Sequence, residues 1–382
     1  MIGSGQATRI GTRKRILHRR SMRRMSGESA VRGLVKSIFL LVNSASGTGS
    51  SDLVVGGLTR GLEGSDVEKT SVQVVSDHVG ARTAAARFLA AAREPCAIIV
   101  GGGGGTLRAV VEAVCSARES DPRPEVDPVR IGVLRMGSGN LLARRLGMPP
   151  AAEAGLSGIL ENLQRERTVP VSVMRCETHA PDGSQLVLFG LAMAGFGQFG
   201  CAPADLARWH RRLGRLRRSI ALPVGLERLN QWEYVLALVL RTLGCAWQPK
   251  RAERVEVVAC GQERRLRLLA GAFFNLPFEE LPFDAGVRLE ERALSVSLIP
   301  CRGRLATLRC LLSPAFLVRC GWHFKLTGTD RCEIRLLDRE SVEFFLDEDP
   351  VLGFQSIALT IGTTLAFVPG PGYAWPPEGP ER

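Results

Sequence analysis

The chain has 382 residues, of which 45% are hydrophobic, 23% are charged and 6% are aromatic. This composition indicates a globular protein with room for two domains, and it excludes a chain disordered throughout, a collagen and a disulfide-stapled miniprotein. The apolar runs fall well short of the roughly 20 residues that span a bilayer. We therefore expect a cytoplasmic protein without a transmembrane segment, either soluble or peripheral at a membrane surface.

The positive charge is concentrated at the start of the sequence. Of the formal net charge of +12, residues 1–36 contribute +9, because they hold ten Lys and Arg side chains against the single Glu28. The segment has no apolar core and no periodicity, which predicts a disordered basic arm rather than a secretory signal. A solvated tail is the simplest interpretation, and a transit-like peptide, a nucleic-acid arm and a tether to an anionic membrane are alternatives.

The ten cysteines and five histidines form no recognisable metal motif. No two cysteines lie closer than nine residues, so no CxxC pair exists, and no HExxH sequence occurs. Without a signal peptide, reduced and buried thiols are expected. Metal binding by His or Cys therefore has little support.

Residues 37–168 predict a parallel α/β domain. Four short apolar runs indicate buried strands, at residues 38–42, 72–75, 96–100 and 130–134. An Ala-rich stretch at 81–92 indicates a helix, and an apolar stripe after Thr106 indicates another, with Thr106 as its N-cap. Strands and helices that alternate in this order form strand–helix–strand units, which build a parallel sheet.

Residues 169–369 predict a second, mostly β domain that is sandwich-like. Short strands separated by turns are expected at residues 170–175, 186–191, 255–260, 266–270, 293–299 and 332–336. One helical stretch is expected near residues 204–243, and the Pro/Gly-rich residues 370–382 are expected to form a tail. The expected architecture is thus an α/β nucleotide-binding domain followed by a β-rich domain.

Two glycine-rich turns follow predicted strands, at residues 101–105 and 137–140. A strand that opens through glycines onto a helix offers free backbone N–H groups and the positive end of the helix dipole, which suits a phosphate. Tight packing without a ligand is the alternative. No GxxxxGK[ST] motif occurs, and Thr106 takes the place of the third glycine of GxGxxG, which disfavours a P-loop ATPase and a dinucleotide-binding dehydrogenase.

Several segments in order resemble the catalytic domain of the diacylglycerol kinase and sphingosine kinase family of lipid kinases. The sequence Val-Asn-Ser-Ala-Ser-Gly at 42–47 is similar to that family's Asn-Pro-x-Ser-Gly motif, and Ser76 with Gly80 and Ala81 is similar to its Thr-x-x-x-Gly-Asp-Ala segment. Residues 100–106 resemble Gly-Gly-Asp-Gly-Thr, and residues 134–147 resemble the segment that begins Pro-Leu-Gly-Thr-Gly-Asn-Asp.

The β-rich half resembles the same family more loosely. Residues 189–197 look like its entry strand, and residues 211–218 look like the basic stretch that follows. The sequence Phe-Leu-Asp-Glu-Asp-Pro at 345–350 is similar to the family's Asp-Gly-Glu-Pro, whose acidic residue is implicated as the base that takes the hydroxyl proton. The resemblance therefore extends from about residue 37 to residue 369.

The resemblance implies ATP and Mg²⁺ as cofactors and a lipid at a membrane surface as substrate. Asp349 is the implied base, and Asp347 is a second acidic candidate in the same run. The implied nucleotide-binding residues lie in the strand-end turns: Asn43, Ser46, Gly47, Ser76, Gly102, Gly103, Gly104, Gly105, Thr106, Ser138 and Asn140.

Two departures from the family pattern concern the metal. Gly104 stands where the family has the Asp of Gly-Gly-Asp-Gly-Thr, so a hard cation loses a carboxylate ligand there. Near residue 291 the family reads Asp-Gly-x-Leu-Asp-Val, and here Glu291 stands in for the first Asp, while Arg292 and Ser295 replace the Gly and the second Asp. Glu291 is thus the implied metal ligand, with a solvated strand-end residue as the alternative.

Three functions are compatible with these residues. The first is an ATP-dependent lipid kinase that phosphorylates a hydroxyl of diacylglycerol or a related lipid. The second is an impaired family member that only binds a nucleotide or a lipid, and the third is an NAD kinase, whose Gly-Gly-Asp-Gly motif is shared. The basic residues 208–218 could lie along an anionic membrane or form a solvated helix face. We expect no nucleic-acid partner, and a homodimer is left open.

Overall fold

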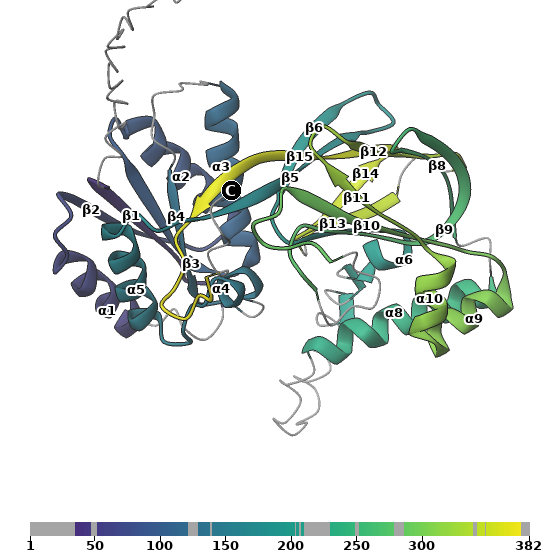
Figure 1. Ribbon diagram of the computed structural model, residues 1–382, viewed down its shortest axis with the longest axis horizontal. Coiled ribbons are helices and arrows are strands. Elements are labelled where there is room, and N and C mark those ends of the chain that lie inside the picture. Colours follow the sequence, from purple (N-terminus) through teal and green to yellow (C-terminus); the bar gives the residue numbers. More distant parts are fainter. Residues whose placement is uncertain are drawn as a thin grey trace, which may run out of the picture. The chain divides into compact units, whose positions relative to one another are not determined.

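The computed structural model describes residues 35–46, 52–120, 129–137, 140–202, 204–205, 208–209, 230–248, 252–278, 286–338, 342–347 and 349–375 (Figure 1). Nearly all of the predicted basic arm, residues 1–34, lies outside these residues. Among the described helices, none has the length and apolarity required to cross a membrane.

The N-terminal half is an α/β layer structure built on four parallel strands. The strands are β1 (Ser37–Asn43), β2 (Lys69–Val75), β3 (Cys96–Gly102) and β4 (Arg130–Arg135), and they lie in the order β2-β1-β3-β4. Helices α2 (His78–Ala91) and α3 (Gly104–Ser120) pack together, as do α1 (Asp52–Glu63) and α5 (Ala152–Gln164). Right-handed crossovers place the two pairs on opposite faces of the sheet, as Figure 1 shows.

Burial explains why the central strands are apolar throughout. From Ile38 onward every residue of β1 is buried, and so is every residue of β3, because helices cover both faces of the sheet. The edge strand β2 is mostly exposed and accordingly carries polar residues. The rings of Phe39 in β1 and Phe88 in α2 stack with centroids 5.0 Å apart, which fixes α2 on the sheet.

The C-terminal half is mostly antiparallel β-structure, as the sequence predicts. Its strands are β5 (Val169–His179), β6 (Gln185–Gly190), β7 (Met193–Phe196), β8 (Glu253–Ala259), β9 (Gln262–Phe274), β10 (Ala293–Pro300), β11 (Trp322–Thr327), β12 (Arg331–Leu336), β13 (Val342–Leu346), β14 (Asp349–Phe354) and β15 (Ser356–Phe367). Its helices are α6 (Gly197–Gly200), α8 (Asn230–Trp247), α9 (Arg304–Leu312) and α10 (Pro314–Cys320). The expected fold class, a parallel α/β domain plus a mostly β region, is confirmed.

Strand β15 joins the two halves. It pairs antiparallel with β12 and β5, and its last two residues, Ala366 and Phe367, pair parallel with β4. All fifteen described strands are therefore linked by hydrogen bonds into one sheet network, although the apolar side chains form two main cores. The first core surrounds the parallel strands, and the second contains the rings of Phe196, Phe344 and Phe354.

Three local expectations need correction. Helix α3 begins at Gly104, so Thr106 lies inside its first turn and is not the N-cap. The expected helical stretch at 204–243 appears in the described residues mainly as α8, which continues to Trp247. The predicted tail is packed where it is described: the N–H of Gly370 donates to the carbonyl of Leu146 at 2.7 Å, and that of Gly372 donates to Gly147 at 3.1 Å.

Candidate functional site

The carboxyl ends of β1, β2, β3 and β4 meet at one edge of the parallel sheet. The chain passes from β1 to β2 on one side and then returns to β3 on the other side of β1, so the strand order reverses between β1 and β3. In open α/β sheets, ligands bind outside the strand ends at such a switch point. The turns that the sequence singles out, after Asn43 and after Gly102, lie at this point.

Asn43 and Ser46 connect the two turns. The Asn43 side chain is buried; its Nδ2 donates to Thr106 Oγ1 at 2.8 Å, and its Oδ1 accepts from the N–H of Ala45 at 2.9 Å. The hydroxyl of Ser46 accepts from the N–H of Gly103 at 3.2 Å. These hydrogen bonds hold the end of β1 against the first turn of α3, so Asn43, Ser46 and Thr106 shape the candidate phosphate site.

The glycines of the two turns pack backbone against backbone. A Cβ at Gly137 would lie 2.4 Å from the Cα of Gly103, and a Cβ at Gly102 would lie 2.7 Å from the Cβ of Thr106. Neither position can accept a side chain without movement of the backbone or of Thr106. The glycine-rich sequence is therefore required by this close approach.

Gly104 is different from its neighbours. A Cβ at this position would meet no atom within 4 Å. Packing therefore does not exclude the carboxylate that the family pattern has here. The first intrahelical hydrogen bond of α3 runs from Leu107 to Gly103 at 3.1 Å, so the N–H groups of Gly104, Gly105 and Thr106 precede it, as helix N-termini require.

Asp349 lies over the first turn of α3. Its carboxylate oxygen Oδ2 is 3.5 Å from the position of a Cβ on Gly105, and it accepts from Arg108 Nη1 at 3.0 Å. The same Nη1 donates to the backbone carbonyl of Leu346 at 2.9 Å. The Arg108 side chain is only 9% exposed, whereas that of Asp349 is 46% exposed. A buried guanidinium thus orients a carboxylate that remains accessible beside the glycine turn.

Glu112 and His78 extend this network, and Arg82 Nη1 lies 3.7 Å from Glu112 Oε2. Arg108 Nε donates to Glu112 Oε1 at 2.9 Å, and the other Glu112 oxygen accepts from His78 Nε2 at 3.1 Å. His78 Nδ1 lies 3.0 Å from the carbonyl oxygen of Gly105. Since both partners of the ring are acceptors, the ring donates to both only when both of its nitrogens carry protons.

The charges set the protonation of this pair. The hydrogen bond to Glu112 raises the pKa of His78 above its ordinary value, against the opposing effect of burial. Burial would raise the pKa of Glu112, but the hydrogen bonds from His78 and Arg108 outweigh it and lower that pKa. The network is therefore an alternation of cations and anions that ends at Asp349.

Sequence reasoning missed Arg108, Glu112 and His78. The one available signal is the spacing of Arg108 and Glu112, which places them one turn apart on the same side of a helix. That pattern is common on exposed helix faces, and only the structure reveals that both side chains are buried.

Asp347 serves the fold in this structure. Its buried carboxylate accepts from the N–H groups of Leu191, Ala192 and Met193 at 2.6, 2.7 and 3.2 Å. Burial raises the pKa of this carboxyl, while the three amide hydrogen bonds act to lower it. The carboxylate holds the connection between β6 and β7, so of the two described acidic residues of this run, Asp349 is the one at the glycine turn.

Glu291 lies before β10 and forms an ion pair with Lys325. The two atoms Oε1 and Oε2 accept from Lys325 Nζ at 3.0 and 3.1 Å, and this contact lowers the pKa of Glu291. Lys325 Nζ also donates to the carbonyl of Gly286 at 3.0 Å. Within the described ranges, no group of three or more His, Cys, Asp and Glu side chains gathers as a metal site would require. This geometry gives no support to Glu291 as a metal ligand.

Of the remaining predicted residues, two are described by the structure and two are not. Ser76 is exposed at the end of β2, with its hydroxyl 3.4 Å from Asp77 Oδ2. Asn140 has φ of 50° and closes the second turn, where its Oδ1 accepts from the N–H of Gly137 at 2.9 Å. Gly47 and Ser138 lie outside the described residues, as do residues 210–218 of the basic stretch.

Comparisons with known proteins agree with this geometry. Residues 37–176 match the model of the diacylglycerol kinase catalytic domain family. None of the curated proteins matches the sequence significantly.

Solved structures extend the similarity over most of the chain. A diacylglycerol kinase from Bacillus anthracis strain Sterne has a TM-score of 0.54 and 15% identity over 89% of this chain and 98% of its own. A second structure from that strain, named as a candidate diacylglycerol kinase, has a TM-score of 0.57 and 16% identity over 89% of this chain and 99% of its own. At this level of identity, the structural similarity establishes the fold.

Proposed function

We infer that this chain, which through residues 37–176 belongs to the diacylglycerol kinase family of lipid kinases, transfers the γ-phosphate of ATP to a hydroxyl of diacylglycerol or a related lipid. The observation that carries this proposal is the position of Asp349, which lies over the first turn of α3 beside the glycine turn and is oriented by Arg108. The proposed phosphate site and an accessible carboxylate are thus adjacent.

The glycine turn would hold the phosphates. The N–H groups at the start of α3 and the positive end of its dipole favour bound anions. Close contact between Gly103 and Gly137 leaves both turns free of side chains at their junction, so the backbone itself can approach a phosphate. The location at the switch point between β1 and β3 supports the same role.

Asp349 would act as the general base. In phosphoryl transfer, the lipid hydroxyl oxygen forms a bond to the γ-phosphorus while the bond to the β–γ bridging oxygen breaks, and the hydroxyl proton passes to the carboxylate. Arg108 holds Oδ2 at 3.0 Å and thereby leaves Oδ1 for the hydroxyl. The burial of Arg108 fixes the carboxylate in this orientation.

The donor set at the turn fits a Mg²⁺ ion that arrives with ATP. Mg²⁺ in kinase sites keeps several waters and is bound by one or two carboxylates together with the phosphates of the substrate. Asp349 is a half-exposed carboxylate at this place, and the space around Gly104 is open, so a hydrated ion has room. The ion supplies neutralisation of the phosphate charge when it is bound. The phosphates of ATP and water would hold it, and a bound water would link it to Asp349, whose Oδ1 then stays available for the hydroxyl.

The test is transfer of labelled γ-phosphate from ATP, with Mg²⁺, to diacylglycerol, monoacylglycerol, ceramide and sphingosine in mixed micelles. We expect the wild type to label one of these lipids. The variant Gly104→Asp serves as the matched comparison, because position 104 accepts a side chain without a clash. Label from Gly104→Asp alone would mean a binding module without activity, and no label from either folded protein would overturn the proposal.

A further inference from the structure

Three helices pack beside the β-rich sheet through a small core of their own. Cys245 of α8, Cys310 of α9 and Cys320 of α10 meet Leu269 of β9 and Ile299 of β10. Helices α8 and α9 contact each other, and α9 contacts α10. Figure 1 shows the three helices together beside these strands. The inner sides of the three helices are thus buried by contacts within the chain.

The outer sides of these helices are apolar and exposed. Eight large apolar residues, which we call the α8–α10 face, are involved: Leu236, Leu240, Leu243, Trp247, Leu305, Leu308, Leu312 and Val318. On α8 and α9 they recur every three or four residues, so each set lies along one side of its helix. Trp247, Leu305 and Leu312 are 80%, 77% and 83% exposed. More than half of the large apolar side chains that are exposed in the described residues lie on these helices.

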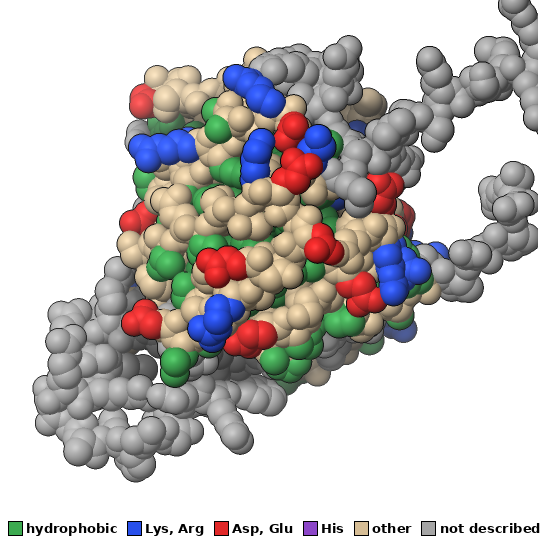
Figure 2. Space-filling view, turned by 90° about the vertical axis from the view of Figure 1, so that its left-hand side faces the viewer, with side chains coloured by type: hydrophobic (Ala, Val, Ile, Leu, Met, Phe, Trp, Pro, Cys, Tyr) green, Lys and Arg blue, Asp and Glu red, His purple; other side chains and the backbone are tan. Residues whose placement is uncertain are grey.

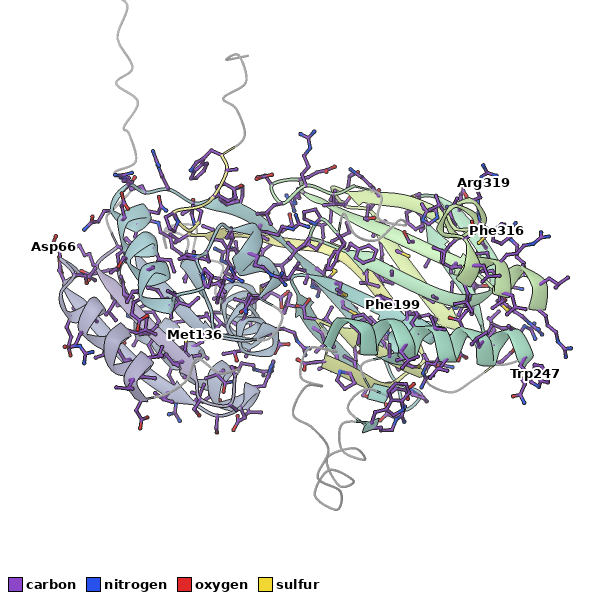
Figure 3. The ribbon with its side chains drawn as sticks, turned by 90° about the horizontal axis from the view of Figure 1, so that it is seen from below. Asp66, Met136, Phe199, Trp247, Phe316 and Arg319 are labelled. Carbon is purple, nitrogen blue, oxygen red and sulfur yellow. The ribbon has the colours of Figure 1, made fainter. Side chains whose placement is uncertain are left out.

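The segment that contains α9 and α10 carries one sign of charge. Residues 300–322 contain four arginines and no Asp or Glu. These arginines, Arg302, Arg304, Arg309 and Arg319, are all exposed, and none has an ion-pair partner in the part of the chain that the structure describes. Figure 3 shows Arg319 beside Phe316, on the same side of the β-rich region as the end of α8 at Trp247.

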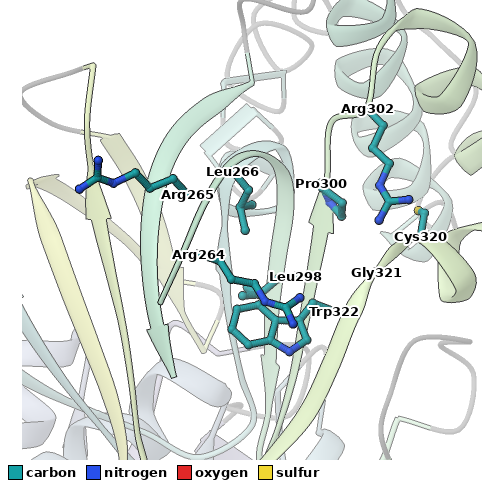
Figure 4. Close-up of a pocket in the computed structure, with 9 residues that line it drawn as sticks. All are labelled: Arg264, Arg265, Leu266, Leu298, Pro300, Arg302, Cys320, Gly321 and Trp322. Atoms are coloured by element: carbon teal, nitrogen blue, oxygen red, sulfur yellow. The ribbon is translucent and has the colours of Figure 1, made fainter. Parts of the chain in front are cut away.

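A basic pocket borders the face. It has a volume of about 510 Å³, and Arg264, Arg302, Leu298 and Trp322 are among the residues that line it (Figure 4). The guanidinium of Arg265 points away from these residues and pairs with Glu256 at 2.8 Å. The Arg264 guanidinium carbon lies 4.2 Å from the centre of the Trp322 ring, which holds its charge at the pocket. The cationic groups therefore continue from the region of the helices onto β9, through Arg264.

The opposite region of the chain lacks this pattern. Its surface, which contains α1 and β2, carries acidic and basic side chains that are interspersed among apolar and neutral groups (Figure 2). Leu53 on α1 and Val74 on β2 are exposed apolar residues on separate elements, and Arg165 after α5 is paired with Glu161 at 2.7 Å. An exposed apolar face beside the unpaired arginines of residues 300–322 is thus a local property of the region around α8, α9 and α10.

We propose that the α8–α10 face docks on a lipid bilayer that contains anionic phospholipids. Helices with an apolar side and basic neighbours bind at the boundary between headgroups and acyl chains, and unpaired arginines add attraction to anionic headgroups. A second copy of this chain is disfavoured as occupant, because a symmetric contact would place the same arginines against each other. The inference rests on the proposed function in one respect: a kinase with a lipid substrate must reach the bilayer in which the substrate resides.

The test is co-sedimentation of the full chain with vesicles, either of phosphatidylcholine alone or of phosphatidylcholine with phosphatidylglycerol. We expect binding only with phosphatidylglycerol present, weaker at high salt. The double variant Leu305→Gln/Leu312→Gln keeps every charge, including those of the N-terminal basic segment, and we expect it to reduce binding at least about tenfold. Arg304→Gln/Arg309→Gln should reduce it about 25-fold, at roughly fivefold for each arginine.

The matched control is Leu53→Gln/Arg165→Gln, which makes the same kinds of change on the other region and should bind like the wild type. Unchanged binding of Leu305→Gln/Leu312→Gln, or equal binding to both kinds of vesicle, would overturn the inference. A dimer in sedimentation that this variant abolishes would also overturn it, because the face would then join two copies.

Failure of the docking inference can be separated from failure of the proposed function. Phosphate transfer to a short-chain diacylglycerol in detergent needs no bilayer, so the variants of the α8–α10 face should keep it. Transfer without vesicle binding would reject the docking inference alone, and vesicle binding without transfer would reject the kinase proposal alone.

Discussion

Arginines appear in two contrasting environments in this chain. Arg108 is buried at the glycine turn, where Glu112, Asp349 and the carbonyl of Leu346 accept from it. The four arginines of residues 300–322 are exposed and have no ion-pair partner in the described part of the chain. A buried charge must be paired to be tolerated, whereas an exposed charge can remain available to a partner. The charge of Arg108 is therefore paired within the fold, whereas the charges of the four exposed arginines remain available to a binding partner.

The largest effect on activity is expected from a change of Asp349, the residue of the Arg108 network that would contact the substrate. Asp349→Asn keeps the shape of the side chain and an acceptor for Arg108, but it removes the proposed base, so the turnover number should fall at least about 100-fold. The measurement is phosphate transfer at saturating lipid. Asp338→Asn, a half-exposed surface carboxylate, is the control and should retain activity. A fully active Asp349→Asn protein would remove Asp349 from the mechanism.

The comparison of the two arginine environments can be tested directly by stability. Arg108→Met leaves Glu112 buried without its guanidinium, and we expect a loss of about 3–5 kcal/mol in the free energy of unfolding. Arg309→Met on the exposed helix α9 should change it by less than about 0.5 kcal/mol. Urea unfolding of the two variants measures the difference. Equal losses would show that burial of the network contributes little.

Gly137 and Gly104 differ in the space around them: backbone atoms crowd Gly137, whereas no atom lies near a Cβ on Gly104. Gly137→Ala forces a Cβ to within 2.4 Å of the Gly103 Cα, and we expect it to cost about 1–3 kcal/mol in the free energy of unfolding. Gly104→Ala meets no atom, and it should be neutral or stabilise α3 by about 0.4–1 kcal/mol. Thermal or urea unfolding distinguishes the pair, and a destabilised Gly104→Ala would contradict the open environment.

The smallest effect concerns pH. Because Glu112 raises the pKa of His78 in the folded state, the stability that this pair adds is fully present below the unfolded pKa of about 6.5 and is lost as the pH rises through the folded pKa. The difference in unfolding free energy between wild type and His78→Gln should therefore be larger at pH 6 than at pH 8. A difference that is constant over this range would show that His78 does not titrate against Glu112.

The sequence predicts what is local and misses what is distant. The strands, the glycine turns and their place at strand ends follow from neighbouring residues, whose apolar runs and glycines directly reflect burial and close approach. The contact between Arg108 and Asp349 joins residues that lie 241 positions apart, so no local sequence pattern predicts it. Asp347 and Asp349 look equivalent in sequence, and only the backbone turn at Asp347, with φ of 50°, directs one carboxylate inward to three amides. Glu291 likewise meets Lys325 only through the pairing of β10 with β11.

The pairing of β15 with β4 affects the order in which the protein can fold during its synthesis. Residues Ala366 and Phe367 complete the outer edge of β4, yet the whole β-rich region separates these two strands in the sequence. During synthesis the parallel sheet must wait with β4 uncovered until that region has left the ribosome, and contacts of such long sequence separation form slowly. The parallel α/β half is therefore synthesised early but completed last, and a nascent chain halted before β15 would present an unpaired strand edge to chaperones.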